Sequence, residues 1–334
     1  MTVAPATPRV TLEQVASFAN LVAAAGRAIS GHRGTRAAQR LLFELEPTVL
    51  ALQRELLAMT WRPGPFRTFT VFEPKERRIA AAPMADRVVH HALCGPLTPV
   101  FEAGAIAHSY ACRVGKGAHK AAAHAQALAR RCRYFLKADV RHYFDSVDHT
   151  VLRAMLAERI DDGRVLELLG RIIDHQPPGA IPGRGIPIGN LSSQHFANLY
   201  LAPLDRAMVA RHGGRYLRYM DDLLLFGDDK AGLHRARADA AALLGERLRL
   251  ELKAAGTFVA PVTQGVPFVG RRIFPGTVRL AHASRSRFVR TWRRRLRQLG
   301  GGLLDAERFL RSAESLVGHL RHLDTFNLRQ AVMT

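Results

Sequence analysis

The sequence predicts a mixed α+β fold in which an antiparallel sheet is backed by helices. Two short apolar runs within 215–226 are separated by the pair Asp221-Asp222, and this pattern is typical of two strands joined by a tight turn. A second apolar segment, 134–138, has the pattern of a buried strand that ends at Asp139. Helical periodicity follows in 150–160, where the apolar positions are Val151, Leu152, Met155, Leu156 and Ile160.

The other elements are predicted in chain order from the same periodicities. Helical patterns cover 12–29 and 35–59, and Pro47 is expected to break or restart the second of them. Short strands are expected at 68–72 and 78–81, around a basic turn. We expect the rest of the chain to follow with helices in much of 84–133, sheet strands and helices in 134–255, a small β element at 266–280, and helices beyond it.

Composition indicates a polyanionic partner. Lys and Arg number 49 against 28 Asp and Glu, which leaves a formal charge of +21 on the 334 residues. Nucleic acid explains such an excess best, and binding through phosphates is strongly salt-dependent. A ribosome-associated protein, or a protein of merely alkaline composition, is the alternative. At 48% hydrophobic residues, the chain can bury a sizeable core and divide into two or three lobes.

Cysteine and apolar patterns argue against other classes. Cys94, Cys112 and Cys132 lack the paired spacing of zinc sites or of a disulfide framework, so we expect reduced and mostly buried thiols. No apolar run reaches the length of a membrane span, and the N-terminus lacks the pattern of a signal peptide. These observations predict a cytoplasmic protein with no membrane partner.

The acidic residues differ in their sequence settings. Carboxylates held by strands suit Mg²⁺, which takes oxygen ligands, and sites with two metal ions need a further carboxylate. Asp139 is the candidate for this further ligand, because a carboxylate at the end of an apolar strand has no capping role. Asp148 is expected to cap the following helix instead. The pairs Asp161-Asp162 and Asp228-Asp229 are likewise expected in loops and at helix starts.

Tyr-Met-Asp-Asp at 219–222, preceded by the segment 137–149 with its own aspartates, resembles the reverse transcriptases. Further motifs of that family occur in the family's order and extend the resemblance over roughly residues 35 to 330. They lie at 74–79, 86–93, 110–119, 185–205 and 265–274. The resemblance implies a right-hand polymerase with fingers, palm and thumb, in which helices back an antiparallel palm sheet.

The resemblance also implies a division of the chain. We expect an N-terminal helical extension at 1–60, fingers with part of the palm at 61–133, the palm at 134–280 and a helical thumb at 281–334. The thumb segment 285–297 contains seven arginines and no acidic residue. An apolar face is predicted there from the spacing of Phe288, Trp292, Leu296 and Leu299. The candidates for contact with nucleic acid are Arg287, Arg290 and Arg294.

Roles at the site follow from the same resemblance. Asp139, Asp221 and Asp222 are the expected catalytic carboxylates and metal ligands, with Mg²⁺ as cofactor and Mn²⁺ as its substitute. The residues expected to contact the dNTP are Lys75, Arg78, Phe144, Ile188 and Gly189. Among them Phe144 is expected under the sugar, where its ring would exclude a ribonucleotide, although a core position is the alternative. Lys253 is the candidate proton donor to pyrophosphate.

One departure narrows the subfamily. Many retroviral and intron-encoded enzymes have Gln before the glycine of the 185–205 motif and Ser-Pro later in it. This sequence has Ile188 before Gly189, and Ser193-Gln194 in place of Ser-Pro. That pattern resembles the reverse transcriptases of bacterial and phage diversity-generating retroelements.

The retroelement resemblance implies a set of partners and leaves alternatives open. The implied partners are a template RNA, a DNA or RNA primer, dNTPs and a basic helical accessory protein. The alternatives are an intron-like, retron-like or defence-associated reverse transcriptase, and a non-catalytic RNA-binding protein with the polymerase fold.

Overall fold

The computed structural model describes the chain except for residues 1–8, 73–75, 319, 321–322 and 334. The chain divides into two compact units, each assembled from three segments. Unit 1 consists of Met1–Ala107, Val140–Ala207 and Ala241–Leu252, and unit 2 of His108–Asp139, Met208–Ala240 and Lys253–Thr334. The four-part division into extension, fingers, palm and thumb remains a prediction.

Unit 1 begins with helices that are shorter than the periodicity predicts. The predicted helix at 12–29 is two helices, α1 (Leu12–Val15) and α2 (Phe18–Ile29), because the Ser17 side chain caps α2 by accepting from the Asn20 N–H. The second predicted helix is also split, into α3 (Arg36–Phe43) and α4 (Leu45–Leu57). The break falls at Glu44, and Pro47 lies in the first turn of α4, where a missing N–H costs little.

The remaining elements of unit 1 agree with the predicted order. The two strands form an antiparallel pair with Phe69 opposite Ile79. Asp148 caps α8, as predicted, by accepting from the Val151 N–H at 3.1 Å. The elements are β1 (Arg67–Phe72), β2 (Glu76–Ala81), α5 (Met84–Ala103), α7 (Tyr143–Ser146), α8 (His149–Ala157), α9 (Gly163–Asp174) and α10 (Leu191–Tyr200).

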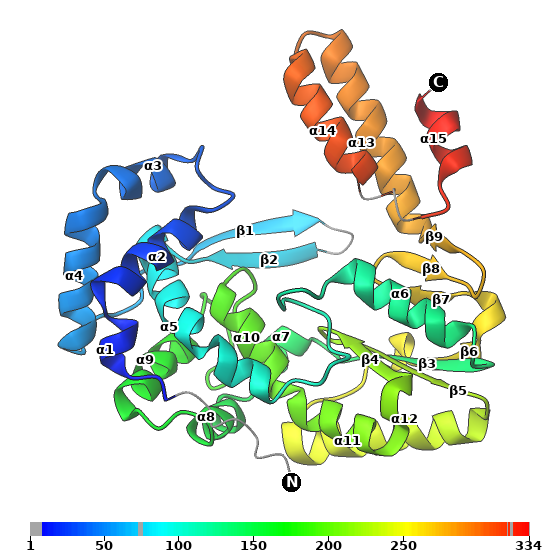
Figure 1. The fold of residues 1–334 in the computed structure, drawn as a ribbon, viewed down its shortest axis with the longest axis horizontal. Coiled ribbons are helices and arrows are strands. Elements are labelled where there is room, and N and C mark those ends of the chain that lie inside the picture. Colours follow the sequence, from blue (N-terminus) through cyan, green and yellow to red (C-terminus); the bar gives the residue numbers. More distant parts are fainter. Residues whose placement is uncertain (1–8, 73–75, 319, 321–322, 334) are drawn as a thin grey trace. The chain divides into compact units, whose positions relative to one another are not determined.

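Unit 2 is built on a four-stranded antiparallel sheet, which confirms the predicted α+β class. Its strands lie in the order β4-β5-β3-β6, so the strand from the upstream motif lies directly beside the hairpin (Figure 1). Their bounds are β3 (Tyr134–Asp139), β4 (Tyr216–Tyr219), β5 (Asp222–Gly227) and β6 (Phe258–Pro261).

Helices cover the sheet on both faces. On one face, α6 (Ala118–Ala129) packs its alanines against a core that includes Phe135 and Phe226. On the other face the sheet meets Met208 of α11 (Ala202–His212) and Ala240 of α12 (Lys230–Leu248). The short elements nearby are the 3₁₀ turns Gly213–Arg215, Ala254–Gly256 and Val262–Gln264 and the small sheet β7 (Val266–Phe268), β8 (Arg271–Ile273) and β9 (Val278–Leu280).

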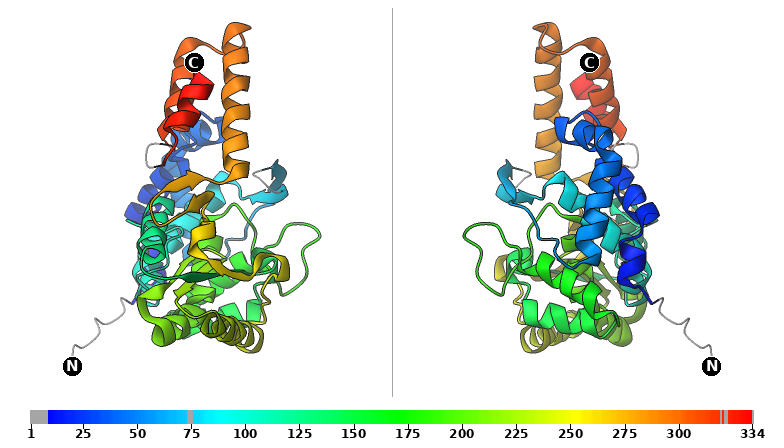
Figure 2. Two further views of the ribbon diagram at one scale, coloured as in Figure 1. Left: turned by 90° about the vertical axis from the view of Figure 1, so that its right-hand side faces the viewer. Right: turned by 90° about the vertical axis from the view of Figure 1, so that its left-hand side faces the viewer.

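Three helices end the chain: α13 (His282–Gly300), α14 (Ala306–Gly318) and α15 (Phe326–Met333). Figure 2 shows α13 and α14 running alongside each other. Phe288 and Trp292 of α13 are buried in this cluster, as predicted. Leu296 was predicted on the same face, but this was wrong, since its side chain is 42% exposed. Each step of four residues advances about 40° around a helix, which carries Leu296 away from the packed face.

The cysteine and hydropathy predictions concern the whole chain. All three cysteines are free, with Cys94 and Cys132 buried and Cys112 exposed. Within the part of the chain that the structure describes, no helix combines the length and the apolar character needed to cross a bilayer.

Candidate active site

The hairpin of β4 and β5 presents the acidic pair at its turn. Tyr219 pairs with Asp222, so the two turn residues are Met220 and Asp221. Met220 has a φ of +57°, which is unusual for a residue with a side chain. The apolar residues of both strands are buried, and they fix the turn to the core of unit 2. The pair therefore projects from a rigid support, as the sequence predicted.

Strand β3 brings the third carboxylate to the same edge of the sheet. In the antiparallel register of β3 with β5, Asp139 lies directly opposite Asp222. Burial raises the pKa of the Asp222 carboxyl to about 6, and the negative charges of Asp139 and Asp221 act in the same direction. The structure thus brings the three predicted catalytic residues together within one unit.

Lys137 lies at this site, and the sequence reasoning missed it. Its ammonium donates to Oδ1 of Asp222, and the two side chains are only 17% and 25% exposed. The positive charge opposes the rise in the pKa of Asp222. A signal was available, because side chains two residues apart on a strand share a face, so Lys137 had to lie on the same face as Asp139.

The donor chemistry at this edge fits a hard divalent cation, since carboxylate oxygens are the ligands that Mg²⁺ prefers. The arrangement is nevertheless not a finished ligand set. Among the described residues, no group of three or more His, Cys, Asp or Glu side chains is placed to hold a metal ion. Oδ1 of Asp222 is engaged by Lys137. Binding of a metal ion by this oxygen would therefore require it to release Lys137.

Lys253 borders Asp139 through the backbone. Its N–H donates to the Asp139 carbonyl at 2.7 Å. A side chain on Gly256 would place its Cβ 3.3 Å from Cβ of Asp139 and 3.6 Å from Cδ of Lys253. Glycine at 256 thus lets the 253–256 turn approach Asp139 closely, and the role of Lys253 as a proton donor to pyrophosphate remains a prediction.

A second group of predicted residues lies in unit 1, along strand β2. The Ala80 N–H donates to the Ile188 carbonyl at 2.9 Å. The Asn190 amide donates to the Ala80 carbonyl of this strand at 3.2 Å and accepts from the N–H of Ala82, just beyond it, at 3.3 Å. Gly189 has a φ of +118°, and a Cβ there would lie 2.8 Å from Cγ2 of Ile79. Only glycine suits this position.

The segment 188–190 is therefore fastened to the strand that carries Arg78. Arg78 is exposed, as its predicted contact with a triphosphate requires. Lys75, the other predicted triphosphate contact, lies outside the described residues. Asn190 was not predicted, because nothing in the sequence shows that its amide pairs with backbone groups of β2.

Phe144 lies in α7, five residues beyond Asp139 in the sequence. Its ring packs edge-on against Tyr143, with centroids 5.6 Å apart, and it is only partly buried. The Tyr143 hydroxyl in turn donates to the Ala197 carbonyl of α10. Phe144 is thus a partly exposed ring on a braced helix, which agrees better with the predicted contact surface than with a fully buried core position.

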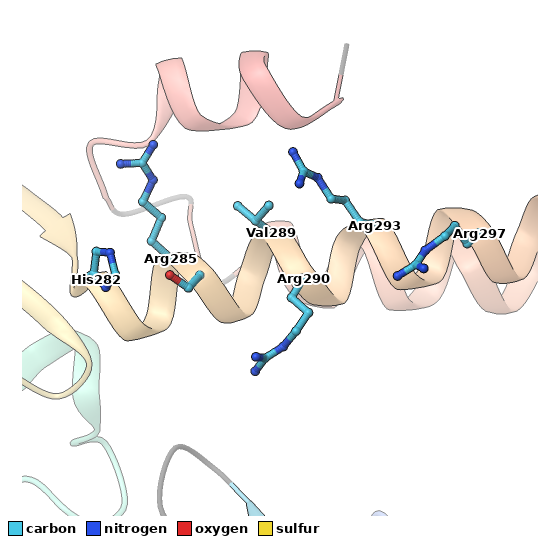
Figure 3. A pocket seen from close by; sticks show the side chains of 7 residues that line it. His282, Arg285, Val289, Arg290, Arg293 and Arg297 are labelled. Carbon is cyan, nitrogen blue, oxygen red and sulfur yellow. The ribbon is translucent and has the colours of Figure 1, made fainter.

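The arginines of α13 line a groove of about 490 Å³ (Figure 3). Of the three arginines predicted to bind nucleic acid, only Arg290 lines this groove, whereas Arg287 and Arg294 do not. The residues that line it are His282, Arg285, Ser286, Val289, Arg290, Arg293 and Arg297. Contact of Arg287, Arg290 and Arg294 with nucleic acid remains a prediction.

Comparisons with known proteins identify the family of the chain. The family model described as reverse transcriptase (RNA-dependent DNA polymerase) matches residues 73–272, more than half of the chain. Protein YkfC of Escherichia coli K12 is 26% identical over 291 residues, which cover 73% of this chain and 75% of YkfC. A protein of Schizosaccharomyces pombe, named as an uncharacterized 91 kDa protein in the cob intron, is 28% identical over 36% of this chain and 15% of its own length.

Among solved structures, apo telomerase from Candida tropicalis is similar with a TM-score of 0.50 at 10% identity. The match covers 68% of this chain and 50% of the telomerase chain, so the chain spans about half the length of that protein. This likeness concerns the fold alone, and it supports the predicted right-hand polymerase architecture. With the family match over both aspartate motifs, the chain belongs to the reverse transcriptase family and is an RNA-directed DNA polymerase.

Proposed function

We propose that this polymerase copies a template RNA into cDNA by nucleotidyl transfer at Asp139, Asp221 and Asp222. The observation that supports the proposal most strongly is the register of β3 and β5, which puts Asp139 opposite Asp222 beside the Asp221 turn. The non-catalytic alternative is disfavoured, because a degenerate site would be expected to lose at least one of the three acids.

Each residue has a proposed task. Asp139 and Asp221 would hold two Mg²⁺ or Mn²⁺ ions, and Asp222 would support the site or bind the ion nearer the primer. When bound, such ions stabilise the attacking and leaving oxygens of an in-line displacement. Lys137 would balance the negative charge of Asp222, with which it forms an ion pair. Lys253, whose N–H donates to the Asp139 carbonyl, is the proposed proton donor to pyrophosphate.

Primer extension on an RNA template tests the assignment. The purified chain with Mg²⁺ or Mn²⁺ is expected to extend a DNA primer, and Asp139→Asn and Asp221→Asn should each lower the rate by several orders of magnitude. Asp228→Asn is the matched control, because Asp228 begins an acidic pair only seven residues beyond Asp221. All variants should unfold at temperatures near that of the unmodified protein. Near-normal synthesis by either catalytic variant would remove the basis of the proposal.

We assign sugar selection to Phe144. Its partly exposed ring, held by Tyr143, would collide with a 2′-hydroxyl of an incoming nucleotide. Phe144→Ala is therefore expected to raise rNTP incorporation relative to dNTP incorporation while cDNA synthesis continues. Competition between labelled dNTP and rNTP on one template measures the ratio. An unchanged ratio in an active variant would show that Phe144 only packs.

The arginine groove of α13 is the proposed nucleic-acid contact of unit 2. It would bind phosphates of the primer and template, since arginines dominate its lining. In unit 1, Arg78 on β2 is the proposed triphosphate contact, beside Ile188 and Gly189.

The subfamily we propose is the diversity-generating retroelement type, in which a template RNA is copied with errors at adenine. Ile188 carries this proposal, because a Gln there could hydrogen-bond the nucleotide pair whereas Ile offers only dispersion contacts. A hydrogen bond of this kind contributes about 0.5–1.5 kcal/mol, and about 1.4 kcal/mol is tenfold in selectivity. Ile188→Gln should lower misincorporation opposite template adenine by up to about tenfold. Sequencing cDNA from both enzymes measures this, and an equal or higher error rate would contradict the role of Ile188.

An intron-encoded polymerase is the second candidate, because the matching Schizosaccharomyces pombe protein is named for its position in an intron. Near-identical template and variable repeats beside the gene would favour the retroelement type, and intron sequences around it the second candidate. A gene for a small basic helical protein next to the repeats would supply the proposed accessory partner.

A further inference from the structure

Among the described residues of unit 2, Arg218 is the most deeply buried arginine or lysine. It lies on β4, three residues before Asp221, and is 1% exposed. A guanidinium stays charged in proteins and has five N–H donors, so burying it is costly unless those donors find acceptors. A leucine or valine would fill an ordinary strand position at less cost. We therefore expect Arg218 to have a specific role.

The guanidinium reaches forward along its own strand to the turn. Nη1 of Arg218 donates to the carbonyl of Met220 at 2.8 Å. The backbone at Arg218 is fixed as well, because its N–H donates to the His108 carbonyl at 3.0 Å and its carbonyl accepts from the Tyr110 N–H at 3.0 Å. The backbone of Arg218 is thus fixed, and its side chain holds the peptide that joins Met220 to Asp221.

The peptide that it holds is the one that carries Asp221. The Met220 carbonyl and the Asp221 N–H belong to the same planar group, so fixing the first orients the second. Met220 adopts its φ of +57° although it has a side chain, and residues in such conformations persist only where their surroundings hold them. The hydrogen bond from Arg218 is a contact that does so.

We propose that Arg218 is a positioning residue, which holds Met220 at positive φ and so fixes the orientation of Asp221. The proposal rests on the proposed role of Asp221 in the reaction. It assigns no contact between Arg218 and substrate. It differs from a general stabilising role, because it acts through one backbone conformation that a glycine adopts without help.

That difference allows a test by rescue. Arg218→Lys is made in two backgrounds, Met220→Ala and Met220→Gly, which both lack the thioether and differ only in the ease of positive φ. In the Ala background the lysine variant should lower kcat for primer extension at least tenfold, with little change in the KM for dNTP. In the Gly background the loss should be about tenfold smaller, matching the advantage of glycine at positive φ. Arg215→Lys, at the start of the same hairpin, is the matched control and should change neither constant.

Each outcome decides the matter. Equal losses in the two backgrounds, or no loss at all, would overturn the proposal. If Arg218→Lys unfolds, Arg218→Gln retains an N–H donor and is read in the same way. Unfolding of both variants in every background would also overturn it, since Arg218 would then serve the core. Activity that survives Asp221→Asn would instead contradict the proposed function, and this is measured independently of any Arg218 variant.

Discussion

Strand β5 carries an aspartate pair at each of its ends, and the two pairs do different work. At its start, Asp222 lies opposite Asp139 and contacts Lys137. Beyond its end, Asp228 accepts from the Arg133 N–H at 3.0 Å, while Asp229 accepts from the N–H groups of Ala231 and Gly232 at 3.0 and 2.7 Å. One aspartate pair thus accepts backbone N–H groups beyond the end of β5, and the other lies where the carboxylates of β3 and β5 converge.

The two pairs differ in the groups that lie against their carboxylate oxygens. Backbone N–H groups at the start of α12 take up the carboxylate of Asp229, as is usual for a helix cap, and Arg215 lies 3.5 Å from Asp228. At the other end, carboxylates face each other across a strand pair, and like charges there need a cation. An acidic pair therefore suggests a catalytic site when acids converge on it, rather than when backbone donors do.

The positive charge of Lys137 beside Asp222 can be removed selectively by mutation. Lys137→Met should lower the Mg²⁺ concentration for half-maximal primer extension at pH 8 by up to about tenfold, because the ammonium competes with the metal for Asp222. Lys230→Met is the matched control, since Lys230 lies over the Tyr134 ring at the opposite end of β3, at 5.1 Å. Mn²⁺ binding by calorimetry gives a second readout without turnover. A weaker metal requirement in the control, or a stronger one in Lys137→Met, would refute the competition.

A smaller effect, on stability, is expected at Asp86, a second buried carboxyl that can be compared with Asp222. Burial raises the pKa of this carboxyl in α5 to about 6, as it does for Asp222, but the Gly64 N–H at 2.7 Å satisfies it. A raised folded pKa means that the stabilising contribution is complete below the unfolded value near 4 and is lost as pH rises through 6. Trp61 also hydrogen-bonds this carboxylate, and an amide has one acceptor oxygen instead of two. Asp86→Asn should therefore stabilise the chain at pH 7 by only about 1 kcal/mol.

Urea unfolding at several pH values checks this prediction. The gain of Asp86→Asn over the unmodified chain should shrink as the pH falls from 7 to 4, and polymerase activity should stay unchanged. A gain of equal size at both pH values would mean that the ionisation of Asp86 is not its cause. A large loss of activity would instead associate Asp86 with the reaction.

Local chemistry explains why much of the fold was predictable. Strands β3 to β5 follow from apolar runs, and the caps at Asp148, Asp162 and Asp229 follow from their positions before helical patterns. Errors arose where a pattern was compatible with several packings. A helix starting at Leu12 is interrupted by the cap at Ser17, and Leu296 rotates out of its predicted face.

The site was predictable only where a residue is marked by its own stretch of sequence. The three aspartates could be found because each is marked by its own strand, and the resemblance joined them. Lys137, Asn190 and Arg218 depend on register or on a backbone conformation instead. Lys137 becomes a partner of Asp222 only through the pairing of strands about eighty residues apart, and Arg218 acquires its acceptor only because Met220 turns to positive φ.

The interleaving of the two units has a consequence for how the chain folds. Unit 1 lacks its last segment until Leu252 has been synthesised, and unit 2 takes its own last segment from the residues that follow. Strand β3 pairs with β5 and β6, which follow it only after long intervening segments of chain. Bringing such distant strands together costs chain entropy before any contact compensates. The chain is therefore expected to fold late and as a whole, and no cut between consecutive segments releases a unit intact. Dissection into independently folding fragments is ruled out by topology, although the molecule has two compact parts.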